Sequence, residues 1–184
     1  MALILIKEDG TGRSDANAYA NAADGDAYHE GHLYASAWTA ATTASKEAVL
    51  VFATRLIDSQ FQFAGSRASE TQALQWPRVG CFDPDKLPSS VLSVLLLASP
   101  FVSASVVPKA VRDATCEMAR ELLLVDRTAS PAGEGLKYQN VGTTQTGYDK
   151  GDTRPVISHV AQAMLAKFGA LVNSRSGAVR LVRG

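Results

Sequence analysis

The residues whose types could do chemistry gather near the start of the chain, at His29, Glu30 and His32. A zinc-protease helix needs two histidines four residues apart with the glutamate beside the first, and these histidines are three apart. Asp24 and Asp26 could share a helix face with them and complete a set of metal ligands. A solvated polar face is far commoner than such a site, so the sequence favours a polar helix surface here.

Three further features resemble catalytic or phosphate-binding elements but lack the residues that would complete them. The loop from Gly10 to Ser14 has neither the Gly-Lys-Ser/Thr ending of a phosphate loop nor a following apolar helix. His159 lies within a predicted helix without a partnered nucleophile, and Cys116 is best explained as a small packing residue. We therefore expect a turn at Gly10 and a protein that is neither an enzyme nor a cofactor carrier.

Trp76, Pro77 and Arg78 form a block with two interpretations. Pro77 keeps Trp76 out of helical geometry, so the indole ring can pack against neighbours or stack with Arg78. The favoured interpretation is a structural anchor. The alternative is a ligand site on which a nucleic-acid base stacks.

Amphipathic helices must position these residues. Apolar side chains recur at helical spacing over residues 45–60, over residues 108–126 and from Pro155 to Phe168, and a shorter helix is expected over residues 21–32. Helices joined in this way can cover their apolar stripes only against one another. The sequence thus predicts a mainly α fold, a small bundle of three to four helices, with a short strand over residues 2–6.

Two segments lie outside this bundle pattern. Residues 128–152 are rich in Gly, Thr, Ser and Asn, which predicts a flexible loop or a β-hairpin turning near Gly142. After a linker, Ala178 to Arg183 alternates apolar and basic residues at the period of a strand, with no obvious partner strand in the chain. We therefore divide the chain into a helical domain, residues 1–176, and a C-terminal docking arm, residues 177–184.

The bulk composition excludes several classes of protein. The eighteen basic and eighteen acidic residues cancel, so the whole chain has no general attraction to nucleic acid or to an anionic membrane. The two ends carry opposite signs, acidic over residues 1–30 and basic after Asp152, either as a surface accident or as a head-to-tail contact between copies.

Neither export nor membrane insertion is expected from this sequence. Cys81 and Cys116 are too few and too far apart for a disulfide framework, which favours assembly in the cytosol. The first residues lack the basic lead-in and the long apolar run of a signal peptide. Serines and a proline interrupt the apolar stretch from Val91 to Val107 below membrane-spanning length.

Six blocks of this sequence resemble a family of tailed-phage proteins. They are Lys7–Gly12, Asn17–Tyr19, Phe52–Asp58, Gln72–Gly80, Val107–Val111 and Gly177–Gly184. Members are often labelled DnaT-like single-stranded DNA-binding proteins, whereas their resemblance to helical adaptors implies a head-to-tail connector. The sequence departs from the family pattern between Asp83 and Val107, where the apolar stretch resembles an insertion.

The resemblance implies a ring, expected to hold twelve copies, between the portal protein and the tail or neck proteins of a virion. Such a ring is assembled in the host cytoplasm and lets double-stranded DNA pass through its lumen without sequence-specific binding. The expected portal contact is the arm, through Val179, Arg180, Leu181, Val182 and Arg183. The expected tail-side or lumen contact is the loop, through Lys137, Tyr138, Tyr148 and Lys150.

Two other functions stay open on the sequence alone. The first is a single-stranded DNA-binding module that uses Trp76, Arg78 and the basic C-terminus. The second is a small hydrolase or metal enzyme built around His29 and His32.

Overall fold

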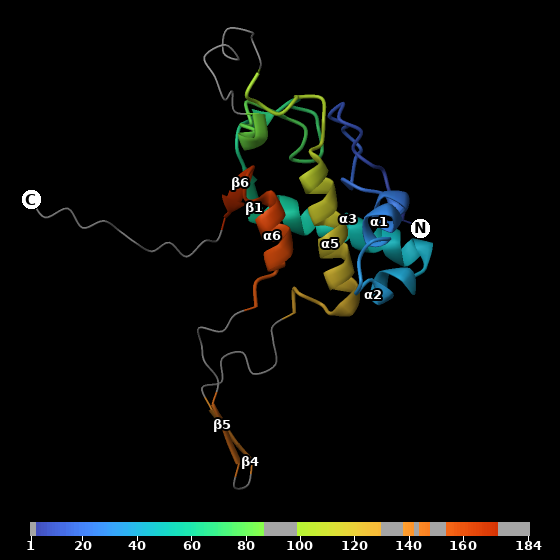
Figure 1. Ribbon diagram of the computed structural model, residues 1–184, viewed down its shortest axis with the longest axis vertical. Coiled ribbons are helices and arrows are strands. Elements are labelled where there is room, and N and C mark those ends of the chain that lie inside the picture. Colours follow the sequence, from blue (N-terminus) through green and yellow to red (C-terminus); the bar gives the residue numbers. More distant parts are fainter. Residues whose placement is uncertain (1–2, 87–98, 130–137, 142–143, 148–153, 173–184) are drawn as a thin grey trace, which may run out of the picture.

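The computed structural model describes residues 3–86, 99–129, 138–141, 144–147 and 154–172 of the chain. The fold is mainly α, as the hydrophobic periodicity predicts. The described helices are α1 (Ala22–His29), α2 (Ser36–Thr39), α3 (Thr43–Gln60), α5 (Lys109–Leu124) and α6 (His159–Leu165), with a short 3₁₀ turn at Pro84–Lys86. None of these helices is long and apolar enough to cross a membrane. In Figure 1, α5 crosses α3 at the centre of the body and α6 packs beside them.

Side-chain caps fix where the helices begin. Asn21 and Asp24 form a reciprocal capping box at the start of α1, and the Thr42 hydroxyl accepts the Ser45 amide at the start of α3. The last helix begins later than its apolar stripe predicts, at His159 and not at Pro155. The reason is that the Ser158 hydroxyl accepts the Ala161 amide and so caps the first turn there.

Three antiparallel pairs of short strands complete the fold. β1 (Phe61–Phe63) pairs with β6 (Gly169–Leu171), β2 (Ser66–Arg67) pairs with β3 (Arg78–Val79), and β4 (Tyr138–Val141) pairs with β5 (Thr144–Gly147). The β4–β5 pair is the hairpin predicted near Gly142. The β1–β6 pair is not predicted by the sequence, and it brings Gly169 so close to β1 that an added Cβ would lie 2.3 Å from the Gln62 carbonyl oxygen.

The N-terminal segment makes less β structure than a strand over residues 2–6 would. Its described pairing is a single parallel bridge between Lys7 and Ala18. Before that bridge, the Asn17 side chain accepts the Ile6 amide at 2.8 Å and donates to the Ile4 carbonyl at 2.8 Å. A side-chain amide therefore replaces the partner strand and ends the ladder.

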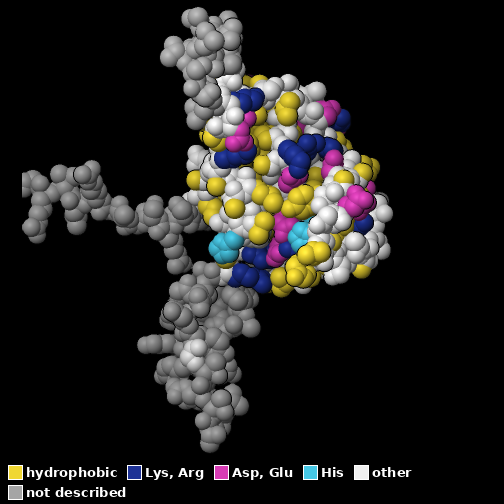
Figure 2. Space-filling view, in the orientation of Figure 1, with side chains coloured by type: hydrophobic (Ala, Val, Ile, Leu, Met, Phe, Trp, Pro, Cys, Tyr) yellow, Lys and Arg dark blue, Asp and Glu magenta, His cyan; other side chains and the backbone are white. Residues whose placement is uncertain are grey.

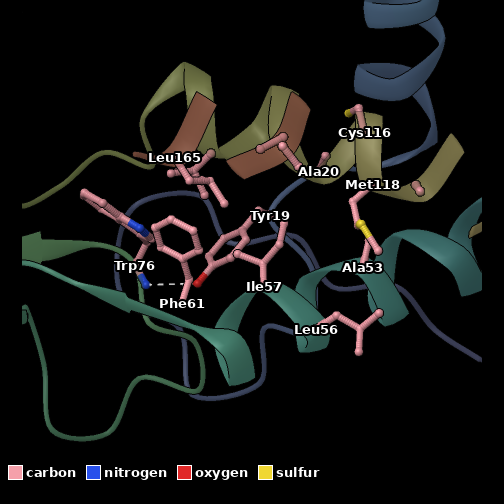
Figure 3. Packing of buried hydrophobic residues seen from close by; sticks show 14 of the residues in the cluster. Tyr19, Ala20, Ala53, Leu56, Ile57, Phe61, Trp76, Cys116, Met118 and Leu165 are labelled. Carbon is pink, nitrogen blue, oxygen red and sulfur yellow. Dashed lines mark hydrogen bonds between the residues drawn. The ribbon is translucent and has the colours of Figure 1, made fainter. Parts of the chain in front are cut away.

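The hydrophobic core joins α3, α5 and α6 to the loop that contains Trp76. Figure 3 shows Ala53 from α3 beside Met118 from α5 and Ile57 from α3 beside Tyr19, with Leu165 above the aromatic rings. Trp76 is fully buried, and its ring contacts Phe63 and Phe168 edge-on at centroid distances of 5.5 Å each. Such large buried side chains supply most of the hydrophobic stabilisation of a small domain.

A buried polar hub lies beneath this aromatic cluster. The Tyr19 hydroxyl donates to an Asp58 carboxylate oxygen at 2.5 Å and accepts the backbone amides of Gln75 and Trp76 at 3.0 and 3.2 Å (Figure 3). The other Asp58 oxygen also accepts the Gln75 amide, at 3.0 Å. Burial raises the pKa of Tyr19 well above its ordinary value, so the phenol stays protonated as a donor.

Replacing Tyr19 by Phe removes the hydroxyl while keeping the ring. We expect the free energy of unfolding to fall by about 1–3 kcal/mol, because the Trp76 amide then loses its acceptor inside the core. Chemical denaturation at pH 7 measures this. Tyr34→Phe is the matched control, since Tyr34 is 76 % exposed and should change stability little. Equal stabilities for the two variants would contradict the role of the hub.

The Asp58 carboxyl makes stability depend on pH. Burial raises its pKa from 3.8 to about 6, against the hydrogen bonds from Tyr19 and Gln75 that lower it. The raised pKa means that Asp58 contributes stability below pH 3.8 that is lost as the pH rises through about 6, by up to about 3 kcal/mol. We expect the stability of the wild type relative to Asp58→Asn to fall between pH 4 and pH 7. A difference that is flat over this range would contradict the assignment.

Candidate functional site

Trp76, Pro77 and Arg78 are buried in the body, and Arg78 is the first residue of β3. The Trp76–Pro77 peptide bond is cis, and the Trp76 side chain has no exposed surface. The Arg78 guanidinium donates to the backbone carbonyls of Ala64 at 2.7 Å and Gly65 at 2.6 Å. It also donates to the carbonyls of Phe63 and Gln75 and to the Gln75 side chain. These contacts hold the loop after β1 closed.

This geometry removes both side chains from any contact with nucleic acid. Base stacking requires an exposed aromatic face, and a phosphate contact requires a guanidinium with free donors. Trp76 offers no such face, and the donors of Arg78 point at carbonyl oxygens of its own loop. A single-stranded DNA site that uses Trp76 and Arg78 is therefore incompatible with the folded body.

The candidate metal ligands do not converge on one point. Asp24 caps α1 and pairs with Lys7, whereas Asp26 accepts the Trp38 indole at 2.8 Å and Lys46 at 2.7 Å. These hydrogen bonds, that from Lys46 first, lower the pKa of Asp26. His29 is buried and donates from Nε2 to the Cys116 carbonyl at 3.1 Å. Within the described residues, no group of three or more His, Cys, Asp or Glu side chains could hold a metal ion.

The backbone amides of the glycine-rich turn at Gly10 bind a side chain of the same protein, that of Glu8. The buried Glu8 carboxylate accepts the amides of Gly10, Gly12 and Arg13, each at 2.9 Å. Gly10 permits this loop because its φ is +100° and an added Cβ would lie 2.1 Å from the Ser105 carbonyl oxygen. The amides that a phosphate would use are thus occupied by Glu8.

The remaining reactive side chains lie apart from one another. Cys116 is buried on α5, and burial raises the pKa of its thiol to about 12, which keeps it protonated and unreactive. His159 is exposed at the first turn of α6. Cys116 and His159 therefore offer no nucleophile and base pair.

An ion pair and hydrogen bonds join the residues on either side of the hairpin segment, residues 128–153. Arg127 is almost fully buried and donates to the carbonyls of Pro155 at 2.7 Å and Val156 at 2.9 Å. Its guanidinium also pairs with Glu121 of α5 at 3.1 Å. Arg154 donates in the opposite direction, to the Asp126 carbonyl at 3.0 Å. These contacts hold residues 126–127 beside residues 154–156, on either side of the hairpin segment. No local pattern in the sequence predicts them.

The hairpin itself is set away from the helices. In Figure 1 the β4–β5 ribbon stands apart from the body, and the register pairs Tyr138 with Gly147 and Val141 with Thr144. Tyr138 is the first residue of β4, whereas Lys137, Tyr148 and Lys150 lie outside the described residues. Val179 to Arg183 also lie outside them.

Charges on the described body are mixed and largely paired. Lys7, Arg13, Lys46, Lys109, Arg120, Arg127 and Lys167 each lie within 3.2 Å of a carboxylate oxygen. Figure 2 shows basic and acidic side chains interspersed on the visible face of the body. Strong attraction to a nucleic-acid backbone needs clustered basic residues with free donors, and the basic side chains named here are already paired with carboxylates.

Replacing Arg127 by Gln tests the base of the hairpin segment. We expect the unfolding free energy to fall by about 1–3 kcal/mol, because two partly buried carbonyl groups lose their charged donor. Hydrogen exchange should accelerate at residues 154–157 more than within α3. Arg55→Gln, which alters an exposed arginine of α3, is the matched control and should change neither quantity. A uniform loss of protection would mean that Arg127 acts only on global stability.

Comparison with known proteins identifies a family through a match over the full chain. One family model matches residues 1–184, and its description is "Putative DnaT-like ssDNA binding protein". No curated protein and no solved structure matches the chain. Because the family model covers every residue, this chain belongs to the DnaT-like family that carries this description.

Proposed function

We propose that this protein is a ring-forming assembly subunit of a phage neck, an adaptor between the portal and the tail. The observation that carries the proposal is the β4–β5 hairpin, which stands away from the body on a base fastened by Arg127. An isolated two-stranded hairpin is marginally stable in water, and its two edges expose unpaired backbone groups. A partner strand or surface that binds the hairpin would both stabilise it and pair its free backbone groups.

The interior of the protein supports a structural role over a chemical one. The buried carboxylates and guanidinia are held by backbone groups or by each other, as with Glu8, Arg78 and the Glu117–Arg120 pair. Side chains arranged in this way position loops and leave no reactive group for a substrate. We propose that contacts with partners are made by the hairpin and by the C-terminal arm, residues 177–184, with the genome passing through the ring unbound.

The second candidate function is single-stranded DNA binding, which the family description favours. Since Trp76 and Arg78 are enclosed, such binding would have to use other residues, and Arg180 and Arg183 are the basic residues nearest the C-terminus. This candidate predicts salt-sensitive affinity for oligonucleotides without any requirement for a portal protein.

Electron microscopy of the full chain mixed with the portal protein of the same phage tests the adaptor proposal. We expect a ring of this protein stacked on the portal ring, and we expect the ring to be lost when residues 177–184 are deleted. Stacking that survives the deletion would keep the adaptor role and remove the arm from it. No stacking with either chain would contradict the adaptor proposal.

Oligonucleotide binding measured on the same preparations separates the second candidate. Single-stranded DNA binding that weakens as salt rises, and that is lost in the Arg180→Gln/Arg183→Gln double variant, would favour DNA binding. Trp76→Ala is not a usable probe, because removing a fully buried indole costs about 3–5 kcal/mol and would weaken folding itself.

A further inference from the structure

The N-terminal segment from Leu3 to Glu8 uses only one of its two backbone sides. The Ile4 carbonyl, the Ile6 amide and the Ile6 carbonyl all bond to Asn17, and the Ile6 carbonyl also accepts the Ala18 amide at 3.3 Å. The Glu8 amide then donates to the Ala18 carbonyl at 2.9 Å. Backbone groups of alternate residues in an extended chain point to the same side. Four backbone groups on the side that faces Asn17 and Ala18 are thus bonded.

The opposite side of this segment is available for pairing. Among the described residues, no hydrogen-bond partner is found for the backbone amides and carbonyls of Leu5 and Lys7, which point away from Asn17. At the start of the segment, Leu3 is 46 % exposed and Ile4 is 72 % exposed. An extended chain with one free backbone side and exposed apolar side chains is an acceptor for an added strand.

The C-terminal residues of a second copy have the composition that such an edge accepts. Val179 and Leu181 stand two positions apart, so both would lie on one face of an added strand, beside Leu3 and Leu5. Arg183 would lie on the same face, near the acidic N-terminal region, where Asp9 is exposed. Charge and hydrophobic pattern therefore favour this segment over a neutral polar strand.

The positions of the two segments favour a neighbouring copy over the same copy. In Figure 1 the blue N-terminal segment lies on one side of α5, and β6, after which the C-terminal residues begin, lies on the other. A donor and an acceptor on opposite sides of a subunit make a head-to-tail contact, which generates a ring when the rotation between successive copies closes.

From these observations we infer that residues 178–183 of one copy add as a strand to the free edge of Leu3–Lys7 in the next copy. The inference rests on the proposed ring and names the contact that links its subunits. It assigns the arm to a neighbouring copy, whereas the sequence alone favours the portal as its partner.

Disulfide trapping between two differently tagged chains tests this contact. One chain carries Leu3→Cys, on the face that would meet Leu181, and the other carries Leu181→Cys. Both are mixed with the portal protein before oxidation. The native Cys81 and Cys116 are buried and should stay unreacted. We expect the mixed disulfide dimer at least tenfold above that formed with Leu33→Cys, the matched control, which alters an apolar residue that is 92 % exposed elsewhere.

The outcomes separate this inference from the proposed function. Rings seen by electron microscopy together with equal trapping at residues 3 and 33 would overturn the strand contact and keep the ring. Rings whose Leu181→Cys chain cross-links only to portal cysteines would assign the arm to the portal and also overturn the inference. Absence of rings under all conditions would contradict the proposed function itself.

Discussion

The fold depends on the hydrogen bonds that the Tyr19 hydroxyl makes with Asp58 and with the amides before Pro77. Tyr19 follows the N-terminal segment, Asp58 lies in the last turn of α3, and Trp76 belongs to the loop that fills the core. One phenol therefore fixes three segments that are far apart in sequence. Because an unpaired buried amide costs more than a hydrogen bond contributes, the aromatic cluster around Trp76 requires this hub to be complete.

Buried charged side chains bind backbone groups elsewhere in the body too. Glu8 organises the glycine turn, Arg78 holds the loop after β1, and Arg127 fastens the base of the hairpin segment. In each case a buried charge is stabilised by backbone groups of its own chain, and such arrangements rigidify a fold. These internal contacts support the proposal that partners are bound by segments outside the helical body.

The local pattern of the sequence predicts most of the helical frame and little of what connects it. Apolar spacing places α3 and α5 within one or two residues, and the Gly-rich loop predicts the β4–β5 hairpin. Pairing of β1 with β6 joins residues more than a hundred positions apart through only three residues each, so no local pattern indicates it. Arg127 and Tyr19 escape prediction for the same reason, because their partners are close only after folding. The burial of Trp76 follows the anchor interpretation of the sequence, yet the sequence could not show that Arg78 would donate to carbonyls in place of stacking.

The family description and the geometry bear on different parts of the molecule. The description names single-stranded DNA as a ligand, whereas the aromatic and basic pair that such binding would most naturally use is enclosed in the core. Two backbone edges are free for association among the described residues, those of the hairpin and the side of Leu3–Lys7 that faces away from Asn17. Backbone edges pair with other polypeptide strands and carry no means of recognising bases. For this reason a protein partner, with a second copy of the chain as the first, accounts for the free edges better than a nucleic acid does.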